Sequence, residues 1–231
     1  MIQTINLIKT YNTQTVLNLP DVKINKGESF GLVGNNGAGK TTFFRLILDL
    51  IRATSGEVQI NGENVAKSDK WKKITGSFLD DNFLIDFLTP EEYFTFLAGM
   101  YKMPKGDLEE FFGEYEAFFN GEVLGRKKYI RELSRGNQQK VGIAAALMAK
   151  PEILILDEPF NGLDPSTQIR LIKLLNELKA KTDITMLISS HDLNHVTEVC
   201  NRILILHEGQ VHKDLIKTEN TMKELEAYFA V

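Results

Sequence analysis

The sequence has little of several features that mark large classes of protein. Its 231 residues include one cysteine, Cys200, which excludes an intramolecular disulfide and is typical of a reducing compartment. The formal net charge is −4, so charge gives no reason to expect nucleic acid as a partner. No unbroken apolar run approaches the ~18 residues that a membrane-spanning helix needs, and the first residues do not form a signal peptide. The sequence therefore predicts no segment that spans a membrane.

A glycine-rich motif is the most informative feature that is present. Residues 34–41 read G-N-N-G-A-G-K-T and match the pattern G-x-x-x-x-G-K-[ST]. They follow a strand-like apolar segment, residues 29–33, and precede a helix-like segment, residues 42–51. Glycines let the backbone approach phosphate closely, and N–H groups at a helix start favour negative charge. The residues predicted to bind a nucleotide here are Gly34, Asn35, Asn36, Gly37, Ala38, Gly39, Lys40, Thr41 and Thr42.

Two side chains of this motif have predicted chemical roles. We expect the Lys40 ammonium to reach the β- and γ-phosphates and the Thr41 hydroxyl to bind Mg²⁺. The chain is therefore predicted to bind ATP or GTP together with Mg²⁺.

A second motif is an apolar run that ends in two carboxylates. Residues 153–156 are Ile-Leu-Ile-Leu, and Asp157 and Glu158 follow directly. Such a run predicts a buried parallel strand whose carboxyl end opens on the ligand site. We expect Asp157 to hold Mg²⁺ and Glu158 to orient or deprotonate the attacking water. Solvated acids at a strand end are the weaker alternative, because a phosphate-binding motif lies upstream.

The third motif, residues 133–140, precedes an alanine-rich helix-like segment. Ser134 is a natural N-cap, and Gly136 leaves backbone N–H groups open, so this helix start can be a second anion site. With its place before Asp157, this motif completes a resemblance to the ATP-binding cassette family, in particular to the nucleotide-binding subunit of an ABC transporter. The signature residues that the resemblance implies are Ser134, Arg135, Gly136 and Asn137.

The resemblance extends over essentially the whole chain and implies further roles. Tyr11 resembles the aromatic residue that stacks on adenine, although it could equally be a surface residue. Asp164 resembles the D-loop aspartate that couples two sites, and His191 resembles the switch histidine that contacts the γ-phosphate. The family pairs two cassettes head to tail, so that the signature of one closes the ATP site of the other. A second copy of this chain is the favoured partner cassette.

The sequence departs from the family pattern at three places. Where the family carries the Q-loop glutamine, we expect Asp80 as an acidic replacement that meets Mg²⁺ or its water, with Asp81 as the rival position. Arg135 and Asn137 replace residues of the usual signature, but Ser134 and Gly136 are retained, so a competent site is expected. Phe160 stands where many relatives have threonine, a change for which the sequence supplies no mechanism.

The expected fold is α/β: a P-loop NTPase core with an N-terminal antiparallel β subdomain and an inserted α-helical subdomain. We expect one ABC ATPase domain over residues 1–231, with the core and β subdomain in 1–84 and 136–231 and the helical subdomain in 85–135. A capping box at residues 89–92 opens the helical part. That part is rich in aromatic residues, most of which should be core, while a minority could line a groove for a partner helix.

The predicted function is that of an ATPase that powers an ABC transporter beneath a separate transmembrane permease subunit. The alternative is a soluble ABC-type ATPase that acts on ribosomes, DNA or a protein complex, which we expect to carry tandem cassettes or a long coiled coil. Neither is present. The expected location is cytoplasmic, peripheral on the inner face of the cell membrane. By family analogy alone, the signature and acidic Q-loop look more like exporter cassettes with ABC-2-type membrane subunits than like importers.

Overall fold

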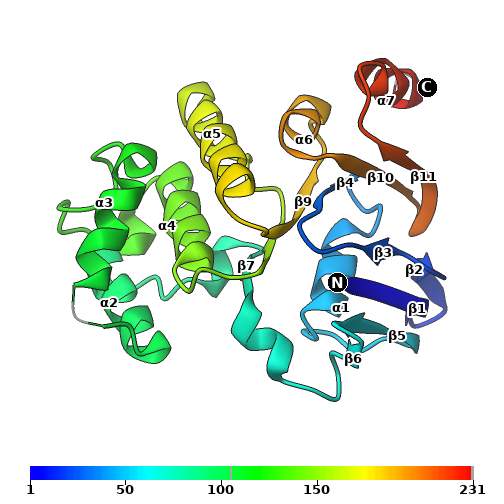
Figure 1. Cartoon of the computed structure of the whole chain (residues 1–231), viewed down its shortest axis with the longest axis horizontal. Helices are drawn as coiled ribbons and strands as arrows, with labels where there is room; N and C mark the ends of the chain where they lie inside the picture. Colours follow the sequence, from blue (N-terminus) through cyan, green and yellow to red (C-terminus); the bar gives the residue numbers. More distant parts are fainter. Residues whose placement is uncertain (105, 230–231) are drawn as a thin grey trace.

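A single mixed sheet forms the centre of the protein (Figure 1). The structure is a computed structural model that describes residues 1–104 and 106–229, apart from the side chains of residues 81 and 226–229. Eleven strands make up the sheet, in the order β6-β5-β1-β2-β11-β10-β4-β9-β8-β7, and β3 pairs with β1 beside this path. Helices cover the sheet and extend beyond its β7 end (Figure 1).

Five neighbouring strands form the parallel part of the sheet. They are β10 (Arg202–His207), β4 (Ser29–Val33), β9 (Thr185–Ser190), β8 (Ile153–Leu156) and β7 (Thr75–Phe78). Every residue of β4, β8 and β9 is buried, as expected for strands covered on both faces. Because these strands are parallel, their carboxyl ends lie at one edge of the sheet, and the loops that leave β4 and β8 at this edge carry the first two predicted motifs.

The remaining strands lie at the other side of the sheet and pair antiparallel, except that β11 meets β2 in parallel. They are β1 (Ile2–Tyr11), β2 (Gln14–Leu19), β3 (Lys23–Ile24), β5 (Ser55–Ile60), β6 (Glu63–Asn64) and β11 (Gln210–Ile216). Sequence analysis did not anticipate β11, which pairs with β10 and joins β2 through Gln210 opposite Asn18. Its residues are mostly polar and exposed, so the strand lacks the apolar alternation that would have revealed it.

Two hydrophobic clusters lie on the two faces of the sheet. In β8 the alternate residues Leu154 and Leu156 belong to the cluster packed under the helices, whereas Ile153 and Ile155 belong to the other. That second cluster includes Phe43 of α1 (Lys40–Ile47) and joins the parallel part to the antiparallel strands. The short 3-10 helix η1 (Lys70–Ile74) closes it with the buried Trp71.

A layer of helices lies between β7 and β8 along the chain. It comprises the 3-10 helix η2 (Asp81–Phe83), α2 (Pro90–Tyr101), α3 (Asp107–Phe119), the 3-10 helix η3 (Ile130–Glu132) and α4 (Arg135–Leu147). The capping box opens α2 as predicted, since the Thr89 side chain accepts from the Glu92 N–H and the Glu92 carboxylate accepts from the Thr89 N–H.

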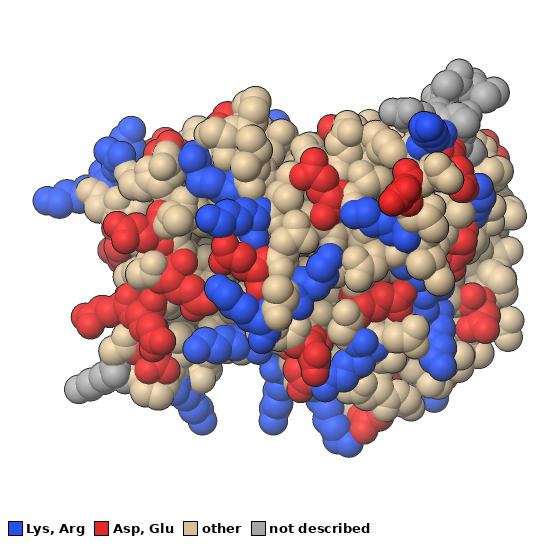
Figure 2. Space-filling model, turned by 45° about the horizontal axis from the view of Figure 1, so that its top comes forward, with Lys and Arg blue, Asp and Glu red and all other residues tan. Residues whose placement is uncertain are grey.

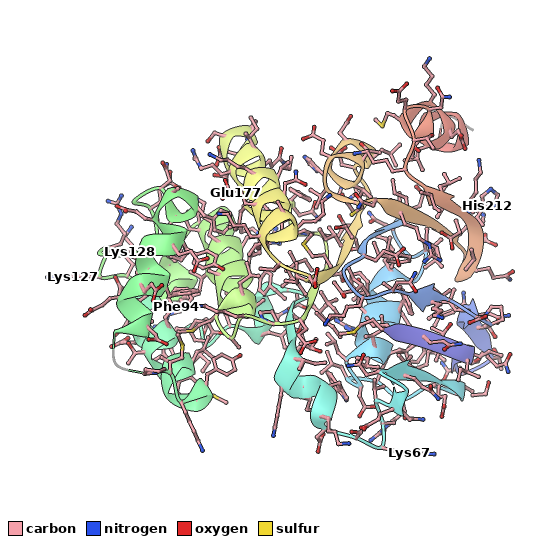
Figure 3. All side chains as sticks on the ribbon, viewed as in Figure 1. Lys67, Phe94, Lys127, Lys128, Glu177 and His212 are labelled. Atoms are coloured by element: carbon pink, nitrogen blue, oxygen red, sulfur yellow. The ribbon has the colours of Figure 1, made fainter. Side chains whose placement is uncertain are left out.

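Aromatic rings fill the inside of this layer. Phe94 is fully buried, with ring centroids of Phe111, Phe112 and Phe119 at 5.3, 5.7 and 5.9 Å. Figure 3 shows Phe94 within the layer and the side chains of Lys127 and Lys128 at its outer end. Six of the ten aromatic residues between positions 87 and 119 are buried, and Phe87, Phe96 and Tyr101 are among the exposed ones. The expectation of a mostly aromatic core with a minority at the surface is therefore confirmed.

Three helices follow β8, β9 and β11 along the chain: α5 (Pro165–Lys181), α6 (Leu193–Val199) and α7 (Thr221–Phe229). In the part of the chain that the structure describes, no helix combines the length and apolar character needed to cross a membrane. Lysine, arginine and acidic side chains are intermixed over much of the face in Figure 2, while acidic side chains gather toward the left, the end that carries α2 and α3 in Figure 1.

Candidate nucleotide-binding site

The glycine-rich motif forms the loop between β4 and α1. Gly39, the N-cap of α1, has φ 106°, in the region that favours glycine. A Cβ on Gly34 would lie 2.4 Å from the carbonyl oxygen of Leu206, so only glycine fits there. The loop thus ends at a helix start whose free N–H groups suit an anion.

Lys40 lies at the first position of α1 and is 6% exposed. Its Nζ donates to the Gly34 carbonyl at 2.6 Å and lies 3.2 Å from Glu158 Oε1. A buried ammonium is stable only when paired, so its position is fixed by these two oxygens. Lys40, the residue predicted to bind phosphate, therefore lies beside the loop and contacts Glu158, the predicted catalytic carboxylate.

Asp157 is the centre of a buried hydrogen-bond group. Thr41 Oγ1 donates to its Oδ2 at 2.5 Å, and the Ser189 hydroxyl donates to its other oxygen. Burial raises the pKa of Asp157 above its ordinary value, although both hydrogen bonds act in the opposite direction. The hydroxyl of Thr41 and the carboxylate of Asp157, distant in the sequence, are hard oxygen donors of the kind that suits Mg²⁺.

Glu158 links the phosphate loop to the predicted switch residue. Its carboxylate lies between two bases, with Oε1 near Lys40 and Oε2 at 2.8 Å from His191 Nδ1. Its backbone has φ 48°, and its N–H donates to Ser189 Oγ at 2.8 Å. Ser189 thus holds both neighbouring carboxylate residues in place, a role that sequence analysis missed even though the serine lies just before the switch segment.

Tyr11 lies beside the phosphate loop, at the end of β1. It is 47% exposed, and Lys9 Nζ lies 4.6 Å from the centroid of its ring. A hollow of about 270 Å³ is lined by Tyr11, Val16, Glu158 and residues 35–42. An aromatic ring on this hollow could stack on a base, so the geometry is compatible with the predicted role.

Asp80 follows β7 and reaches a neighbouring hollow of about 350 Å³. Asp157, Glu158 and Arg135 also line that hollow. The Asp80 carboxylate accepts from the Asn82 N–H at 2.8 Å and lies 3.7 Å from Arg45 Nη2, on α1. The side chain of the rival residue, Asp81, lies outside the described residues.

The signature segment starts α4. Ser134 is its N-cap and accepts from the Asn137 N–H at 3.3 Å. A Cβ on Gly136 would lie 3.0 Å from the carbonyl oxygen of Gly162, so glycine permits the close approach of the loop after β8. Asn137, one of the departures, donates from its side chain to the Glu122 carbonyl at 3.4 Å.

A charged pair behind the signature was not anticipated. Lys140 is 1% exposed, and its Nζ lies 2.7 Å from Glu122 Oε2. The hydrogen bonds to Lys140 and Asn120 hold the pKa of the Glu122 carboxyl below its ordinary value. The sequence signal that could have indicated this pair is the single lysine within the alanine-rich helical segment. Together with the Asn137 contact, this pair ties the start of α4 to the segment after α3.

Asp164 caps α5. Its carboxylate accepts from the N–H groups of Ser166 and Thr167 at 3.0 and 3.1 Å and from both of their hydroxyls at 2.6 Å. These bonds hold the pKa of Asp164 well below its usual range. The side chain therefore has a clear structural role as a helix cap, in addition to the coupling role that the resemblance implies.

Phe160 has a structural explanation in the fold. It is 3% exposed, and its ring stacks on that of His195 with centroids 4.3 Å apart and planes at 22°. His195 belongs to α6, the helix that follows the switch segment. The aromatic ring thus joins the loop after β8 to α6, the helix that follows His191.

The comparisons with known proteins agree with this arrangement. The family model described as ABC transporter matches residues 17–161, more than half of the chain. The chain belongs to this family. It is an ATP-binding cassette, and the family members are ATPases. The predicted family, the predicted P-loop α/β fold class and the predicted ATPase activity are confirmed.

The curated relatives are ATP-binding proteins of transporters. The bacitracin transport ATP-binding protein BcrA of Bacillus licheniformis is 35% identical over 93% of this chain and 69% of its own length. The methionine import ATP-binding protein MetN of Carboxydothermus hydrogenoformans is 34% identical over 86% of this chain and 60% of its own length. The chain thus spans about two thirds of the length of these relatives. Their names support the transporter interpretation over the soluble alternative.

Solved cassette structures have the same fold. The dimeric post-hydrolysis state of the ATP-binding cassette MJ0796 bound to ADP and Pi has a TM-score of 0.83 at 27% identity, with 94% of this chain and 98% of that chain covered. A structure of the ATP-binding subunit of an ABC transporter has a TM-score of 0.83 at 29% identity, with 100% and 93% covered. ATP is accordingly the nucleotide of this fold.

Proposed function

We propose that this protein hydrolyses MgATP as a head-to-tail pair of cassettes and thereby drives a separate transmembrane permease. The observation that carries the catalytic part is the position of the Glu158 carboxylate, 3.2 Å from Lys40 Nζ and 2.8 Å from His191 Nδ1. Lys40 can bind the phosphate, Glu158 can act as the general base, and His191 can position Glu158. ATP hydrolysis requires such groups close together.

In this proposal each side chain has one task. The γ-phosphate replaces Glu158 as the partner of Lys40, which leaves the Glu158 carboxylate to accept a proton from the attacking water. His191 holds that carboxylate in place through Oε2. Thr41 and Asp157 hold Mg²⁺, which supplies charge neutralisation for the phosphates. Asp80 is assigned as the acidic Q-loop residue, and Tyr11 as the platform for adenine.

The dimeric part of the proposal follows from where the signature lies. No described residue that lines the hollow beside the phosphate loop comes from the signature, residues 134–137. Of the signature residues, Arg135 reaches only the neighbouring hollow beside Asp157 and Glu158. We infer that the anion site at the start of α4 takes its phosphate from a second cassette. On this basis Ser134, Gly136 and their two altered neighbours face the γ-phosphate bound to the partner, and Asp164 couples the two sites.

A mixing experiment tests the head-to-tail arrangement. Lys40→Ala chains lack a working phosphate loop, and Ser134→Arg chains lack a working signature, so each homodimer should be inactive. A mixed dimer contains one intact site, built from the loop of one chain and the signature of the other. We expect ATPase activity to return on mixing, whereas mixing two Lys40→Ala preparations is the matched control. An inactive mixture, or full activity of Ser134→Arg alone, would contradict the proposal.

The membrane part of the proposal is supported by an apolar surface beside Asp80. A hollow of about 320 Å³ is lined by Leu48, Leu50, Trp71, Leu79 and Phe83, among others. Phe83 and Leu50 are 53% and 50% exposed, and Phe87 is 61% exposed. Exposed aromatic residues beside a groove suit an apolar helix of a partner. We infer that a cytoplasmic helix of the permease docks here, which places the protein at the inner face of the membrane.

Co-purification from gently solubilised membranes tests this docking. A multi-span membrane protein in near-equal amount is expected with the wild type, and the charged substitutions Leu50→Glu and Phe83→Glu should reduce its recovery. Ile169→Glu, at an exposed apolar residue of α5, is the matched control. Recovery with ribosomes or DNA factors alone would favour the soluble alternative and would leave the ATPase site unaffected.

A further inference from the structure

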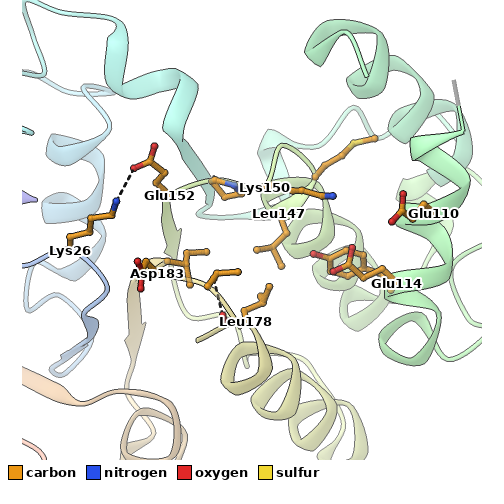
Figure 4. Close-up of a pocket in the computed structure, with 13 residues that line it drawn as sticks. Lys26, Glu110, Glu114, Leu147, Lys150, Glu152, Leu178 and Asp183 are labelled. Carbon is orange, nitrogen blue, oxygen red and sulfur yellow. Dashed lines mark hydrogen bonds and ion pairs between the residues drawn. The ribbon is translucent and has the colours of Figure 1, made fainter. Parts of the chain in front are cut away.

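A second large cavity lies at the end of the parallel sheet that is opposite the nucleotide site. It has a volume of about 690 Å³ and is lined by residues of α3, the end of α4, the end of α5 and the adjoining turns (Figure 4). The lining residues Glu152 and Ile184 directly precede β8 and β9, whereas Asp157 and His191 directly follow these strands. The two sites are thus separated by the length of the strands, and no proposed nucleotide-binding residue lines this cavity.

The cavity has the composition of a small-molecule site. Its volume lies within the range of ~300–1,000 Å³ that is usual for ligand pockets. Its floor is apolar and largely buried, and it is built from Tyr115, Leu147, Met148, Pro151, Leu178 and Ile184. Such a floor favours an apolar body, because contact removes hydrocarbon surface from water on both sides.

One largely buried side chain on this floor carries a hydroxyl without a hydrogen-bond partner among the described residues. Tyr115 is 3% exposed, and its hydroxyl makes no hydrogen bond with any described residue. Burial, followed by the negative charge of Glu114, raises the pKa of Tyr115, so the hydroxyl remains a donor. A tyrosine hydroxyl in such a place normally donates to an acceptor. Because Tyr115 lines the cavity, its hydroxyl is available there for an acceptor on a ligand.

The rim of the cavity carries an excess of negative charge. Figure 4 shows Glu110 and Glu114 on the α3 side, with Asp183 across the cavity. Within the part of the chain that the structure describes, none of these three carboxylates has a hydrogen-bond or ion-pair partner. Glu152 is paired with Lys26 at 3.9 Å, which leaves Lys150 as the unpaired cation of the described rim. Three free carboxylates against one ammonium favour a positively charged ligand.

We propose that this cavity binds an amphipathic organic cation, with its apolar body on the floor, its amine among Glu110, Glu114 and Asp183, and an ether or carbonyl oxygen at the Tyr115 hydroxyl. The ligand contacts α3 and the α5–β9 turn at once, so it joins the helical layer to the sheet. This site is independent of the proposed function, because it shares no residue with the nucleotide site.

Calorimetric titration with 4-phenoxybenzylamine tests the proposal on the full chain. This probe combines two aromatic rings, an ether oxygen and a protonated amine. The alcohol and the carboxylic acid with the same ring system are the neutral and anionic controls. We expect the amine to bind about tenfold more tightly than the alcohol, from several weak charge contacts, and the acid to bind least well. Equal affinity for amine and alcohol would overturn the assignment of a cation site.

Variants locate the binding site of the probe. Replacing both Glu110 and Glu114 by Gln should weaken binding of the amine by about fivefold. Glu109→Gln with Glu116→Gln is the matched control, because it removes the same charge from α3 at two residues that do not line the cavity. Equal loss in both double variants would indicate only a general attraction to an acidic helix and would overturn the proposal.

Two further measurements separate this site from other apolar surfaces. Tyr115→Phe should weaken the phenoxy probe about threefold through loss of one hydrogen bond, and should leave unchanged the affinity of 4-benzylbenzylamine, which has no ether oxygen. Saturating ATP should leave binding of the phenoxy probe intact. Displacement of the probe by ATP would assign the probe to the nucleotide site and contradict the proposed cation site. If the protein failed to bind ATP at all, that result would contradict the proposed function and leave the cation site unaffected.

Discussion

The two ends of the parallel strands differ in how their charged residues are arranged. At the carboxyl ends, Glu158 contacts both Lys40 and His191, and Asp157 is held by two hydroxyls. At the amino ends, Glu110 and Asp183 surround a cavity and have no ion-pair partner among the described residues. Paired groups around a phosphate loop create a site with fixed geometry. Unpaired carboxylates over an apolar floor mainly favour ligands of positive charge.

The largest expected effect comes from removing the base at the carboxyl end of β8. Glu158→Gln should lower ATP turnover by about 10²–10⁴-fold, because the amide cannot accept the proton of the attacking water. ATP binding should persist, and an ATP-dependent dimer should accumulate in light scattering. Glu152→Gln, at the other end of the same strand, is the control and should leave turnover nearly unchanged. Equal ATPase activity of the two variants would contradict the assignment of Glu158 as the general base.

The phosphate ligand gives the next largest effect. Lys40→Ala should weaken ATP binding by at least ~100-fold, because it removes a buried cation and leaves the carboxylate of Glu158 without that partner. A nucleotide titration measures the change. Lys26→Ala, at an exposed lysine beside the opposite cavity, should have little effect. Undiminished affinity in Lys40→Ala would remove the assigned phosphate loop from the site.

Asp157 lies in the nucleotide site, where its buried carboxylate is needed for activity but lowers the stability of the nucleotide-free protein. Its folded-state pKa is raised above 3.8, so the folded state binds the proton more tightly than the unfolded state. The stability that this proton supplies is complete below the unfolded value and is lost as pH rises through the raised value. Asp157→Asn should therefore increase the free energy of unfolding of the nucleotide-free protein at pH 7 and abolish Mg²⁺-dependent ATPase activity.

Urea unfolding between pH 4 and 8 measures this effect. The gain of Asp157→Asn over the wild type should grow with pH, since only the wild type becomes charged. Asp183→Asn, at the exposed rim of the opposite cavity, is the matched control for the loss of one carboxylate. A variant that is less stable than the wild type at pH 7 would mean that the two hydroxyl donors outweigh the cost of burial.

The smallest expected effect concerns Asp80, which stands at the edge of the nucleotide site. Asp80→Ala removes a half-exposed contact with Arg45, so the stability change should stay below about 1 kcal/mol. We expect the Mg²⁺ concentration for half-maximal ATPase activity to rise a few-fold, because one carboxylate near the metal is lost. Asp69→Ala, which removes a surface pair with Lys72, is the control. An unchanged Mg²⁺ dependence would exclude Asp80 from the metal site.

Local patterns in the sequence predicted much of the fold and of the candidate site. The capping box of α2 and the β8 segment with its two carboxylates were foreseen because their signals lie in consecutive residues. Strand β11 was missed because its polar residues carry no such signal, and the Lys140–Glu122 pair was missed because its members lie far apart in the chain. The stacking of Phe160 on His195 likewise depends on α6 packing beside the loop after β8.

By itself, the sequence determined the chemistry of the nucleotide site, because a phosphate loop needs glycines, a lysine and a helix start in one short segment. Tertiary structure alone decided the partners of these groups. Thr41 meets Asp157 across 116 residues and Glu158 meets His191 across 33, because β4, β9 and β8 are neighbours and end at one edge. The opposite cavity arose in the same way, from the packing of α3 against α4 and α5 near the amino ends of β8 and β9, contacts that no local pattern encodes.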